Sequence, residues 1–478
     1  MNDTSRTYDV VVIGAGPVGE NVADRTKAAG LSTVIVESEL LGGECSYWAC
    51  EPSKALLRPV LARADARRVP GLKQAVGGPL DVAAVLAHRD DIVNHWHDDD
   101  QVEWLNSVSV DVVRGHGRLD GPRQVVVSTP DGGSVRLTAR HVVAVCTGSG
   151  PALPDLPRLN EVRHWTSRDV TSADAVPGRL VVVGGGVVAV EMATAWNALG
   201  AEVTMLVRDG LLTRMEPFAG ELVTDALREA GVDMRFGTTV TAVARDDGPE
   251  GEVAITLADG GRLVADEILF AIGRAPRTDD IGLETIGLTP GDWLKVDDTC
   301  RSTAVEDGWL YAVGDVNHRV LMTHQGKYQA RIAGAVIAAR VKGEPVDEAR
   351  WGTHVTTADS VAVPQVVFTD PEVAAVGLSA REAERAGHRV RVVDRDFGSV
   401  AGAVQYAEGF RGMARMVVDL DRGTVVGVTF VGPGVAELLH SATIAVISEV
   451  PVERLWHAVP AFPTISEVWL RLMEAYRG

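Results

Sequence analysis

The sequence predicts an α/β fold built from two βαβ units, followed by a smaller C-terminal domain of the α+β type. Residues 9–37 and residues 179–208 share one layout, in which a strand leads into a glycine turn, a helix and a second strand. After about residue 350 the pattern becomes rich in strands, and it ends in helices from about residue 434. Strands that alternate with helices favour parallel sheets, so each repeated segment is expected to form a separate domain of Rossmann type.

Length and composition bound the possible functions. The 478 residues suggest about three domains, and 46% hydrophobic with 23% charged residues is typical of a soluble globular protein. A net charge of −19 argues against nucleic acid or an anionic membrane as the partner. Four cysteines do not form a secreted framework, no apolar run reaches membrane-spanning length, and the N-terminal "YDVVVIGAG" is expected to be a strand, not a signal peptide. A cytoplasmic location is therefore expected.

The first glycine turn has the spacing G-x-G-x-x-G, formed by Gly14, Gly16 and Gly19. Two glycines allow a tight turn and a close approach to a pyrophosphate, and the third lets the helix pack against the strand. The helix N-terminus then presents unpaired N–H groups to the phosphates. Glu37 ends the second strand, where a carboxylate can accept hydrogen bonds from ribose hydroxyls. The pattern predicts a dinucleotide site; the alternative is a merely structural turn.

The second glycine turn, formed by Gly184, Gly186 and Ala189, is followed by arginines instead of an acid. Its second strand runs into Arg208, and Arg214 lies six residues further on. Arginines would pair with a 2′-phosphate, which a carboxylate would repel. This turn therefore predicts an NADP(H) site, and the alternative is an NAD site with two solvated arginines.

Two of the four cysteines, Cys45 and Cys50, stand in "GGECSYWACEPSK" (residues 42–54). They could be buried structural thiols, or zinc ligands, although no further cysteine or histidine stands nearby at ligand spacing. They could also form a redox disulfide at the start of one helix, because five residues span about one and a half turns and a bond across them would be strained and easily reduced. Cys146 and Cys300 are expected to be inert.

Several segments together resemble the flavin-dependent pyridine nucleotide–disulfide oxidoreductases, which include dihydrolipoamide dehydrogenase, glutathione reductase and mercuric reductase. "GGECSYWACEPSK" is similar to the redox segment of that family, and "VVAVCTGSGP" is similar to its T-G-S segment. "ILFAIGRAPRTDDIGL" and "GWLYAVGDV" resemble further cofactor motifs, while "VVFTDPEVAAVGL" and "GVTFVGPGVAELLH" resemble its dimerisation domain. The resemblance covers nearly the whole chain.

The resemblance implies a role for each residue that matches a motif. The first glycine turn would bind FAD, with Asp315 on the ribityl chain. Cys50 would lie against the flavin as a charge-transfer thiolate, and Cys45 would be the outer, interchange thiol. Lys54 would pair with Glu191 near the flavin atom that receives the hydride of NADPH. The cofactor sites would also include Lys54 itself, Gly43, Gly117, Thr147, Gly148 and Gly273.

The same resemblance implies a domain order and an oligomeric state. An FAD domain would comprise residues 1–153 and 274–348, and an NAD(P)H domain would comprise residues 154–273. Residues 349–478 would form an α+β dimerisation domain, so a homodimer is expected. Tyr47 and Trp48, between the two redox cysteines, are expected to shape the mouth of the site.

The pattern breaks near the C-terminus. Disulfide reductases of the family carry an H-P-T-x-S-E segment, whose histidine is the acid/base for the interchange thiol and whose glutamate orients that histidine. Here the segment is "FPTISE": Glu467 is retained, but Phe462 stands where the histidine would be. Because a positioned acid/base contributes about 10²–10⁴-fold to the rate, this replacement predicts altered chemistry. The alternative is that Phe462 is an ordinary core aromatic residue in a diverged enzyme. Five other histidines are expected to be surface or packing residues: His88, His95, His97, His440 and His457.

These observations predict an enzyme that passes electrons from NADPH through FAD to a Cys45–Cys50 disulfide and on to an unidentified small-molecule acceptor. A standard glutathione- or lipoamide-type substrate is not expected, and no metal site is predicted. One alternative is a diaphorase whose flavin reduces quinones or dyes directly. A second, suggested by Phe462, is chemistry like that of 2-ketopropyl coenzyme M carboxylase. A third is an inert FAD-binding redox sensor.

Overall fold

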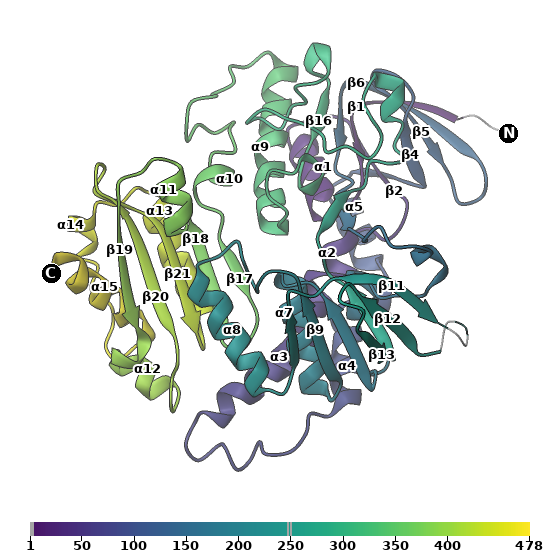
Figure 1. The fold of residues 1–478 in the computed structure, drawn as a ribbon. Coiled ribbons are helices and arrows are strands. Elements are labelled where there is room, and N and C mark those ends of the chain that lie inside the picture. Colours follow the sequence, from purple (N-terminus) through teal and green to yellow (C-terminus); the bar gives the residue numbers. More distant parts are fainter. Residues whose placement is uncertain (1–3, 246–247, 249–250) are drawn as a thin grey trace. The chain divides into compact units, whose positions relative to one another are not determined.

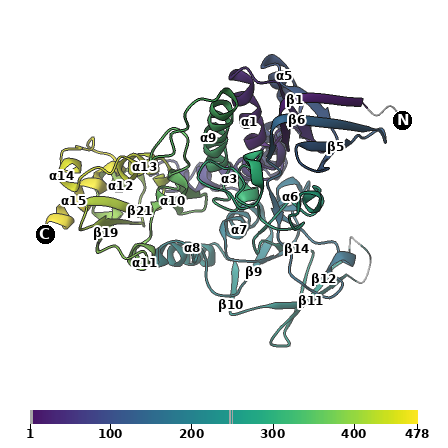
Figure 2. The ribbon, with the colours of Figure 1, turned by 90° about the horizontal axis from the view of Figure 1, so that it is seen from above.

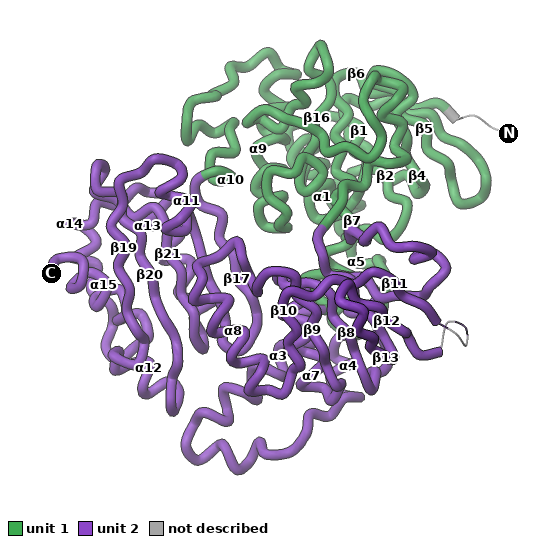
Figure 3. The backbone as a smooth tube through the Cα atoms, viewed as in Figure 1, with its two compact units in different colours: residues 1–52, 90–150, 274–360 green, residues 53–89, 151–273, 361–478 purple. Residues whose placement is uncertain are grey.

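The computed structural model describes residues 4–245, 248 and 251–478. The chain divides into two compact units, each assembled from three segments (Figure 3). Unit 1 comprises residues 1–52, 90–150 and 274–360, and unit 2 comprises residues 53–89, 151–273 and 361–478. The finer domain limits expected from the sequence remain a prediction.

Unit 1 is built on a seven-stranded sheet in the order β3-β2-β1-β6-β5-β4, with β16 also paired to β6. Strands β1, β2, β3, β6 and β16 pair in parallel, and β4, β5 and β6 pair antiparallel. The strands are β1 (Thr4–Ile13), β2 (Thr33–Glu37), β3 (Asp111–Arg114), β4 (His116–Leu119), β5 (Gln124–Ser128), β6 (Ser134–Val145) and β16 (Leu310–Ala312).

Both faces of this sheet are covered, which explains why β1 is apolar at successive positions instead of alternating with polar residues. Val11 and Ile13 belong to one hydrophobic core, and Val10 and Val12 belong to another on the opposite face. Helices α1 (Pro17–Ala28) and α9 (Thr323–Lys342) pack side by side (Figure 1). The short distance between them requires Gly334, where an added Cβ would lie 2.5 Å from the Cβ of Arg25.

The remaining elements of unit 1 are short and lie mostly in connections. The helices are α2 (Gly43–Tyr47), η1 (Asn94–Trp96), α5 (Asp99–Ser107), η3 (Leu283–Ile286), η4 (Glu306–Gly308) and η5 (Asp315–Asn317). Strands β7 (Ser149–Pro151) and β15 (Arg274–Pro276) pair with each other. Three helices run across the limits between segments of the two units: α3 (Cys50–Arg67), α4 (Val82–Ile92) and α10 (Ala358–Val361).

Unit 2 contains the second βαβ layout on a parallel sheet in the order β10-β9-β8-β14. Its strands are β8 (Arg179–Val183), β9 (Glu202–Val207), β10 (Asp233–Phe236) and β14 (Glu267–Phe270). The helices are η2 (Leu159–Glu161), α6 (Ser167–Ser172), α7 (Val187–Leu199) and α8 (Pro217–Glu229). A three-stranded antiparallel sheet adds β11 (Val240–Arg245), β12 (Val253–Leu257) and β13 (Arg262–Ala265).

The C-terminal part of unit 2 is an antiparallel sheet in the order β17-β18-β21-β20-β19. The strands are β17 (Gln365–Val367), β18 (Glu372–Gly377), β19 (Val390–Asp396), β20 (Met413–Asp419) and β21 (Thr424–Gly432). Helix α13 (Leu439–Ile447) packs on β18 and β21, and α15 (Val468–Arg477) packs on β19 and β20 (Figure 2). The other helices are α11 (Ala380–Arg385), η6 (Phe397–Ser399), α12 (Ala401–Tyr406), η7 (Val435–Leu438), α14 (Val452–Leu455) and η8 (Ile465–Glu467).

The architecture agrees with the predicted fold class. Both glycine-turn segments form strand, helix and parallel strand, and the chain after residue 361 forms an α+β domain. Among the described residues, no helix combines the length and the hydropathy that a membrane span requires.

Candidate active site

The glycines of the first turn allow contacts between backbone segments that a side chain would block. Gly14 has a φ of +97°, and a Cβ there would lie 2.6 Å from the carbonyl oxygen of Cys146. A Cβ at Gly19 would lie 1.9 Å from the Gly14 carbonyl oxygen, and one at Gly43 would lie 2.7 Å from the Cα of Gly16. Helix α1 starts after Gly16 without a side-chain cap, so its first N–H groups are available to an anion.

Glu37 lies at the end of β2, where the dinucleotide hypothesis requires a carboxylate. Its Oε2 accepts the N–H of Ala15 at 2.7 Å, and its Oε1 accepts the N–H of Glu39 at 2.8 Å. These two bonds fix the carboxylate beside the glycine turn and leave further lone pairs for ribose hydroxyls.

Asp315 begins η5 and is held by two residues that the sequence analysis did not single out, Ser149 and Arg274. Its Oδ2 accepts a hydrogen bond from Ser149 Oγ at 2.6 Å, and Arg274 Nε donates to the same Oγ at 2.6 Å. Burial raises the pKa of the Asp315 carboxyl, and the bond from Ser149 and the charge of Arg274 oppose that effect. The T-G-S and G-R motifs contained both partners, but only their position in the fold shows that they meet.

The polar groups around the first glycine turn fit FAD. The Oγ1 of Thr147, next to Gly148, is buried and has no hydrogen-bond partner among the residues that the structure describes. Together with the open helix start at Gly16, the carboxylate of Glu37 and the Ser149-bound Asp315, this hydroxyl fits a ligand that carries phosphates, a ribose and a polyol chain. These residues are therefore the ones that would hold FAD.

An ion pair between Arg277 and Glu44 lies in the same unit. Arg277 Nη2 donates to Glu44 Oε2 at 2.8 Å, and Arg277 Nη1 lies 3.4 Å from Glu39 Oε2. Glu44 follows Gly43 in the redox segment, so an unneutralised carboxylate there would repel a pyrophosphate. Arg277 offsets that charge, and sequence reasoning missed the pair because its members are more than 230 positions apart.

Gly117 and Gly273 are two further glycines that the family resemblance implies for the cofactor sites. Gly117 lies in β4, where an added Cβ would be 3.0 Å from Val36 Cγ1, so its small size serves packing against the end of β2. Gly273 has a φ of +149°, and its carbonyl accepts the N–H of Ala152 at 3.0 Å.

The two cysteines do not lie in one helix, which corrects the expectation from their spacing. Cys45 belongs to α2, and Cys50 is the first residue of α3. The break follows Tyr47, whose carbonyl accepts a hydrogen bond from Trp96 Nε1 at 3.1 Å. A hydrogen bond to Cys50 and burial raise the pKa of the Cys45 thiol well above its usual range.

Cys50 also contacts α9. Its Sγ lies 3.4 Å from Thr323 Oγ1, at the first residue of that helix. The two thiols and this hydroxyl therefore lie in one cluster within unit 1. A dithiol–disulfide couple requires its two sulfur atoms to lie close together.

Tyr47 does not shape the mouth of the site. Its ring is buried, and its hydroxyl donates to Gln101 Oε1 at 2.9 Å in α5. Trp48 is half-buried and packs edge-on against Tyr47. Cys146 and Cys300 are both buried in the core of unit 1, and burial raises the pKa of each thiol, so both remain protonated.

Lys54 and Glu191 form the predicted pair within unit 2. Lys54 Nζ lies 2.7 Å from Glu191 Oε2, and Glu191 is buried in α7. The other oxygen, Oε1, accepts the N–H of Phe368 at 3.0 Å, and Lys54 Nζ lies 5.1 Å from the centre of the Phe368 ring. The carboxylate is thus fixed from two sides and holds the ammonium group in one place.

The second glycine turn differs from the first in its third position. Gly184 has a φ of +136°, and a Cβ there would lie 2.3 Å from the Ala271 carbonyl oxygen. Ala189 is fully buried, and its methyl group would lie 3.6 Å from that added Cβ, so the helix stands slightly farther from the turn than α1 does. Gly186 caps α7 and has open space around it, as a nucleotide phosphate would require.

The arginines after β9 extend into solvent. The side chain of Arg208 is 83% exposed, and its Nε lies 3.0 Å from Asp209 Oδ2. Arg214 is also exposed. Both guanidinium groups are therefore accessible to a phosphate ligand.

The C-terminal segment carries Phe462 at the position where the family resemblance implies an acid/base histidine. Phe462 is 73% exposed in the single chain, while Glu467 is buried and its Oε2 accepts the N–H of Gly402 at 3.2 Å. The five histidines named as surface residues are all exposed: His88, His95, His97, His440 and His457. Among residues 4–245, 248 and 251–478, no group of three or more His, Cys, Asp and Glu side chains is placed to hold a metal ion.

Comparison with known proteins decides the family. The family described as pyridine nucleotide-disulphide oxidoreductase matches residues 8–332, and its dimerisation domain matches residues 363–473. The chain belongs to this family. It is an FAD-dependent pyridine nucleotide oxidoreductase, and the fold class predicted from the sequence is that of the family.

The relatives of this oxidoreductase include enzymes with different substrates. It is 33% identical to dihydrolipoyl dehydrogenase 3 of Pseudomonas aeruginosa, over 96% of both chains. It is 32% identical to a mercuric reductase of Shigella flexneri, over 97% of this chain and 80% of the relative. Its fold matches the HOCl-induced flavoprotein disulfide reductase RclA of Escherichia coli with a TM-score of 0.82, at 22% identity over 98% and 99% of the two chains.

A further structural neighbour is LpdA of Mycobacterium tuberculosis. The TM-score is 0.81 at 25% identity, and the match covers 98% of this chain and 99% of LpdA.

Proposed function

We propose that this oxidoreductase uses NADPH to reduce a Cys45–Cys50 disulfide and passes the electrons to a small-molecule acceptor outside the glutathione and lipoamide type. The reaction balances as NADPH, one proton and the disulfide giving NADP⁺ and two thiols. The acceptor then takes two electrons and two protons, and the disulfide forms again. The observation that carries this proposal is the placement of the two cysteines: Cys45 lies in α2, and Cys50 begins the next helix with its Sγ 3.4 Å from Thr323 Oγ1.

FAD, when bound, supplies the two-electron relay between the nicotinamide and the disulfide. The residues of the chain bind and orient the reacting groups. Lys54 Nζ lies 2.7 Å from Glu191 Oε2, so its ammonium charge is fixed within unit 2. Thr323 Oγ1, 3.4 Å from Cys50 Sγ, is placed to donate a hydrogen bond to the thiolate that forms when the disulfide is reduced.

The preference for NADPH is supported by the two accessible arginines after β9. Arg208 and Arg214 lie where the family would carry an acidic residue for the ribose of NAD. Arginine forms bidentate, charge-assisted hydrogen bonds with a phosphate. The ion pair between Asp209 and Arg208 is exposed, and such a pair contributes little to stability. A 2′-phosphate can therefore replace the Asp209 carboxylate as the partner of Arg208.

Phe462 supports an unusual acceptor. Disulfide exchange on a peptide or lipoamide substrate needs a thiolate to attack and a leaving thiolate to be protonated. Burial and the bond to Cys50 keep the Cys45 thiol protonated, and phenylalanine cannot remove that proton. An acceptor whose leaving group needs no protonation relaxes part of this requirement, and a small activated disulfide with a low-pKa leaving thiolate is such an acceptor. The two protons that balance the reduction are then taken up from solvent.

The homodimer expected from the sequence is part of the proposal. The dimerisation domain matches residues 363–473, and several large apolar side chains in that range are exposed, four of them by more than half. Exposed fractions are 60% for Val404, 52% for Ile444, 86% for Val459 and 73% for Phe462. Large exposed apolar side chains grouped on one domain are typical of a surface that another protein chain covers.

Anaerobic reduction with NADPH tests the disulfide relay. One equivalent of NADPH should raise the number of alkylatable thiols by two per chain and produce a long-wavelength absorption band from the Cys50 thiolate. The variant Cys45→Ser provides the control, because it cannot form the disulfide. An unchanged thiol count in the wild type, with rapid oxidation of NADPH, would reject the relay.

Phe462 also favours a second candidate, a diaphorase in which quinones or dyes react at the flavin without the cysteines. In that case Cys45→Ser would retain nearly all of the quinone turnover with NADPH. Loss of about 10-fold or more in the same assay would reject the diaphorase and support the relay.

A further inference from the structure

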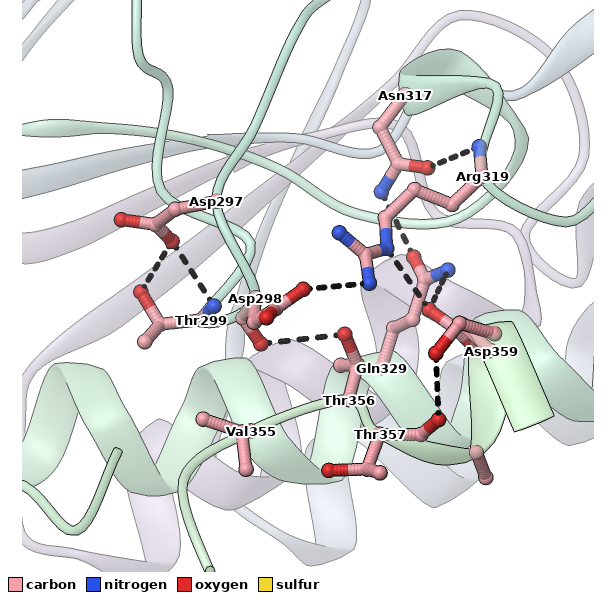
Figure 4. A network of polar contacts seen from close by, with 12 residues as sticks. Asp297, Asp298, Thr299, Asn317, Arg319, Gln329, Val355, Thr356, Thr357 and Asp359 are labelled. Atoms are coloured by element: carbon pink, nitrogen blue, oxygen red, sulfur yellow. Dashed lines mark hydrogen bonds and ion pairs between the residues drawn. The ribbon is translucent and has the colours of Figure 1, made fainter. Parts of the chain in front are cut away.

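Asp359 lies in a buried polar network of unit 1, outside every motif of the sequence (Figure 4). Its side chain is 2% exposed, and its carboxylate accepts hydrogen bonds from three side chains. Gln329 Nε2 donates at 2.9 Å, Gln325 Nε2 donates at 3.0 Å and Arg319 Nε donates at 3.2 Å. A buried carboxylate is tolerated only when it is paired and hydrogen-bonded, and these three donors meet that requirement.

Gln329 connects this carboxylate to the turn before Asp315. The Gln329 side chain is fully buried in α9, and its Oε1 accepts the N–H of Gly314 and the Nδ2 of Asn317, both at 2.8 Å. A carboxylate can only accept and a backbone N–H can only donate. Because Asp359 is on one side of the amide and Gly314 on the other, only one orientation of the Gln329 amide satisfies both.

The turn that Gln329 holds leads directly into Asp315. Gly314 has a φ of +82°, in the left-handed region, and the next residue begins η5. Asn317 Nδ2 also donates to the Ala312 carbonyl at 3.0 Å, and its Oδ1 accepts the N–H of Arg319 at 3.0 Å. These bonds fix the peptide on both sides of Asp315, so the direction of its carboxylate depends on the network.

The segment that carries Asp359 is anchored at a second point. The N–H and the Oγ1 of Thr356 both donate to the Asp298 carbonyl, at 2.9 Å and 3.1 Å. Arg319 Nη2 donates to Asp298 Oδ1 at 2.8 Å. Asp359 is therefore held in place by contacts that do not depend on Gln329, and it can serve as the fixed end of the link.

We propose that Asp359 is a positioning residue for the flavin site, which acts through the Gln329 amide on the Gly314–Asp315 turn. The inference rests on the proposed role of Asp315 in holding the ribityl chain. It predicts that the link matters for retention of FAD, and that Asp359 and Gln329 act as a unit and not independently.

The rate at which the holoenzyme releases FAD, followed by the rise in flavin fluorescence, tests this link. Gln329→Met removes the amide at nearly constant volume and should speed release about 10-fold, the effect of losing one or two buried hydrogen bonds. Gln325→Met is the matched control, because Gln325 donates to Asp359 from the same helix but has no hydrogen bond to the turn. It should change release by less than about 3-fold.

Asp359→Asn supplies the coupling measurement. Alone it should speed release, and in combination with Gln329→Met it should add nothing to the effect of Gln329→Met. The unfolding temperature and the absorption maximum of bound FAD are recorded for every variant. Gln329→Glu is a second variant for the same step, because it keeps the acceptor for Gly314 but cannot donate to Asp359.

The outcomes distinguish the proposed role of Asp315 from the proposed link between Asp359, Gln329 and the Gly314–Asp315 turn. Additive effects of Asp359→Asn and Gln329→Met, or equal effects of the two methionine variants, would overturn the positioning role. Fast release from Asp315→Asn together with normal release from Gln329→Met would overturn this inference alone. Normal release from Asp315→Asn would overturn the proposed role of Asp315 and this inference with it.

Discussion

Glu467 Oε2 accepts a hydrogen bond from the backbone N–H of Gly402 at 3.2 Å. Gly402 lies in the first turn of α12, where backbone N–H groups lack partners within the helix. Glu467 is 5% exposed, so this bond satisfies a buried carboxylate and connects η8 to α12. We infer that this contact gives Glu467 a structural role, in place of the histidine-orienting role that the family resemblance implies.

The first prediction follows from that contact. Glu467→Ala should lower the free energy of unfolding by about 1–3 kcal/mol, because it removes the acceptor for a buried N–H. Glu467→Gln retains an acceptor oxygen and should lower it by less. Thermal unfolding measures both, with Glu474→Ala as the control, since Glu474 forms an exposed pair with Arg471. Equal unfolding temperatures for Glu467→Ala and the control would contradict a structural role.

The second prediction concerns the missing acid/base group. Phe462→His should raise the NADPH-dependent reduction of glutathione disulfide or lipoamide by about 10-fold or more, because a positioned imidazole can take the proton of the Cys45 thiol. Phe462→Leu changes the ring without adding a proton acceptor and should give no gain. If neither substrate is reduced faster by the histidine variant, the altered specificity has another cause.

The third prediction tests the choice of nucleotide. Arg208→Ala combined with Arg214→Ala should raise KM for NADPH about 10–100-fold and leave KM for NADH nearly unchanged, because a charge-assisted hydrogen bond to the 2′-phosphate is lost. Steady-state kinetics with both nucleotides measure the effect. Arg235→Ala is the control: this arginine lies on β10 and pairs with Asp233 at 2.8 Å. A parallel loss with NADH would show that the arginines do not recognise the 2′-phosphate.

The fourth prediction concerns pH. Burial raises the pKa of Glu20, in the first turn of α1, from 4.5 to about 7, and the charge of Lys327 opposes that effect. Between these two pH values the folded chain keeps a proton that the unfolded chain has lost, so the free energy of unfolding falls as pH rises through this window. Above pH 7 the group is ionised in both states, and the penalty stays constant at about 3 kcal/mol or less.

Glu20→Gln removes the ionisable group and should therefore unfold at a higher temperature than the wild type at pH 8. Near pH 4.5 the two proteins should unfold at nearly the same temperature, because the wild-type carboxyl is then protonated in the folded state and about half protonated in the unfolded state, so little of the penalty has developed. Glu103→Gln, an exposed position on α5, is the control. A difference that is independent of pH would refute the titration of Glu20 as its cause.

The two glycine turns could be predicted from the sequence because each is a local structure. A strand, a turn and a helix within about 30 residues are specified by their own hydrophobic pattern and by the glycines that the turn requires. The same holds for the C-terminal strands and for Phe462 as a departure from the family segment. Each of these features depends on residues that are neighbours in the chain.

The positions of the cysteines could not be predicted in this way. Their spacing is compatible with one helix, but Trp96, about 50 residues away, takes the carbonyl of Tyr47 and separates α2 from α3. The orientation of Tyr47 toward Gln101 has the same origin. When a helix boundary depends on a side chain from a distant segment, the residues next to the boundary do not predict it.

The family, the two glycine turns, the cysteine pair and the phenylalanine at position 462 could be recognised from the amino-acid sequence alone, because each depends on residue types at short, fixed spacing. The way Asp315 is held depends on the fold, since Ser149, Arg274 and the Asp359–Gln329 link come from distant segments. Buried polar groups must find hydrogen-bond partners wherever the fold brings them together, and a linear pattern does not contain that information.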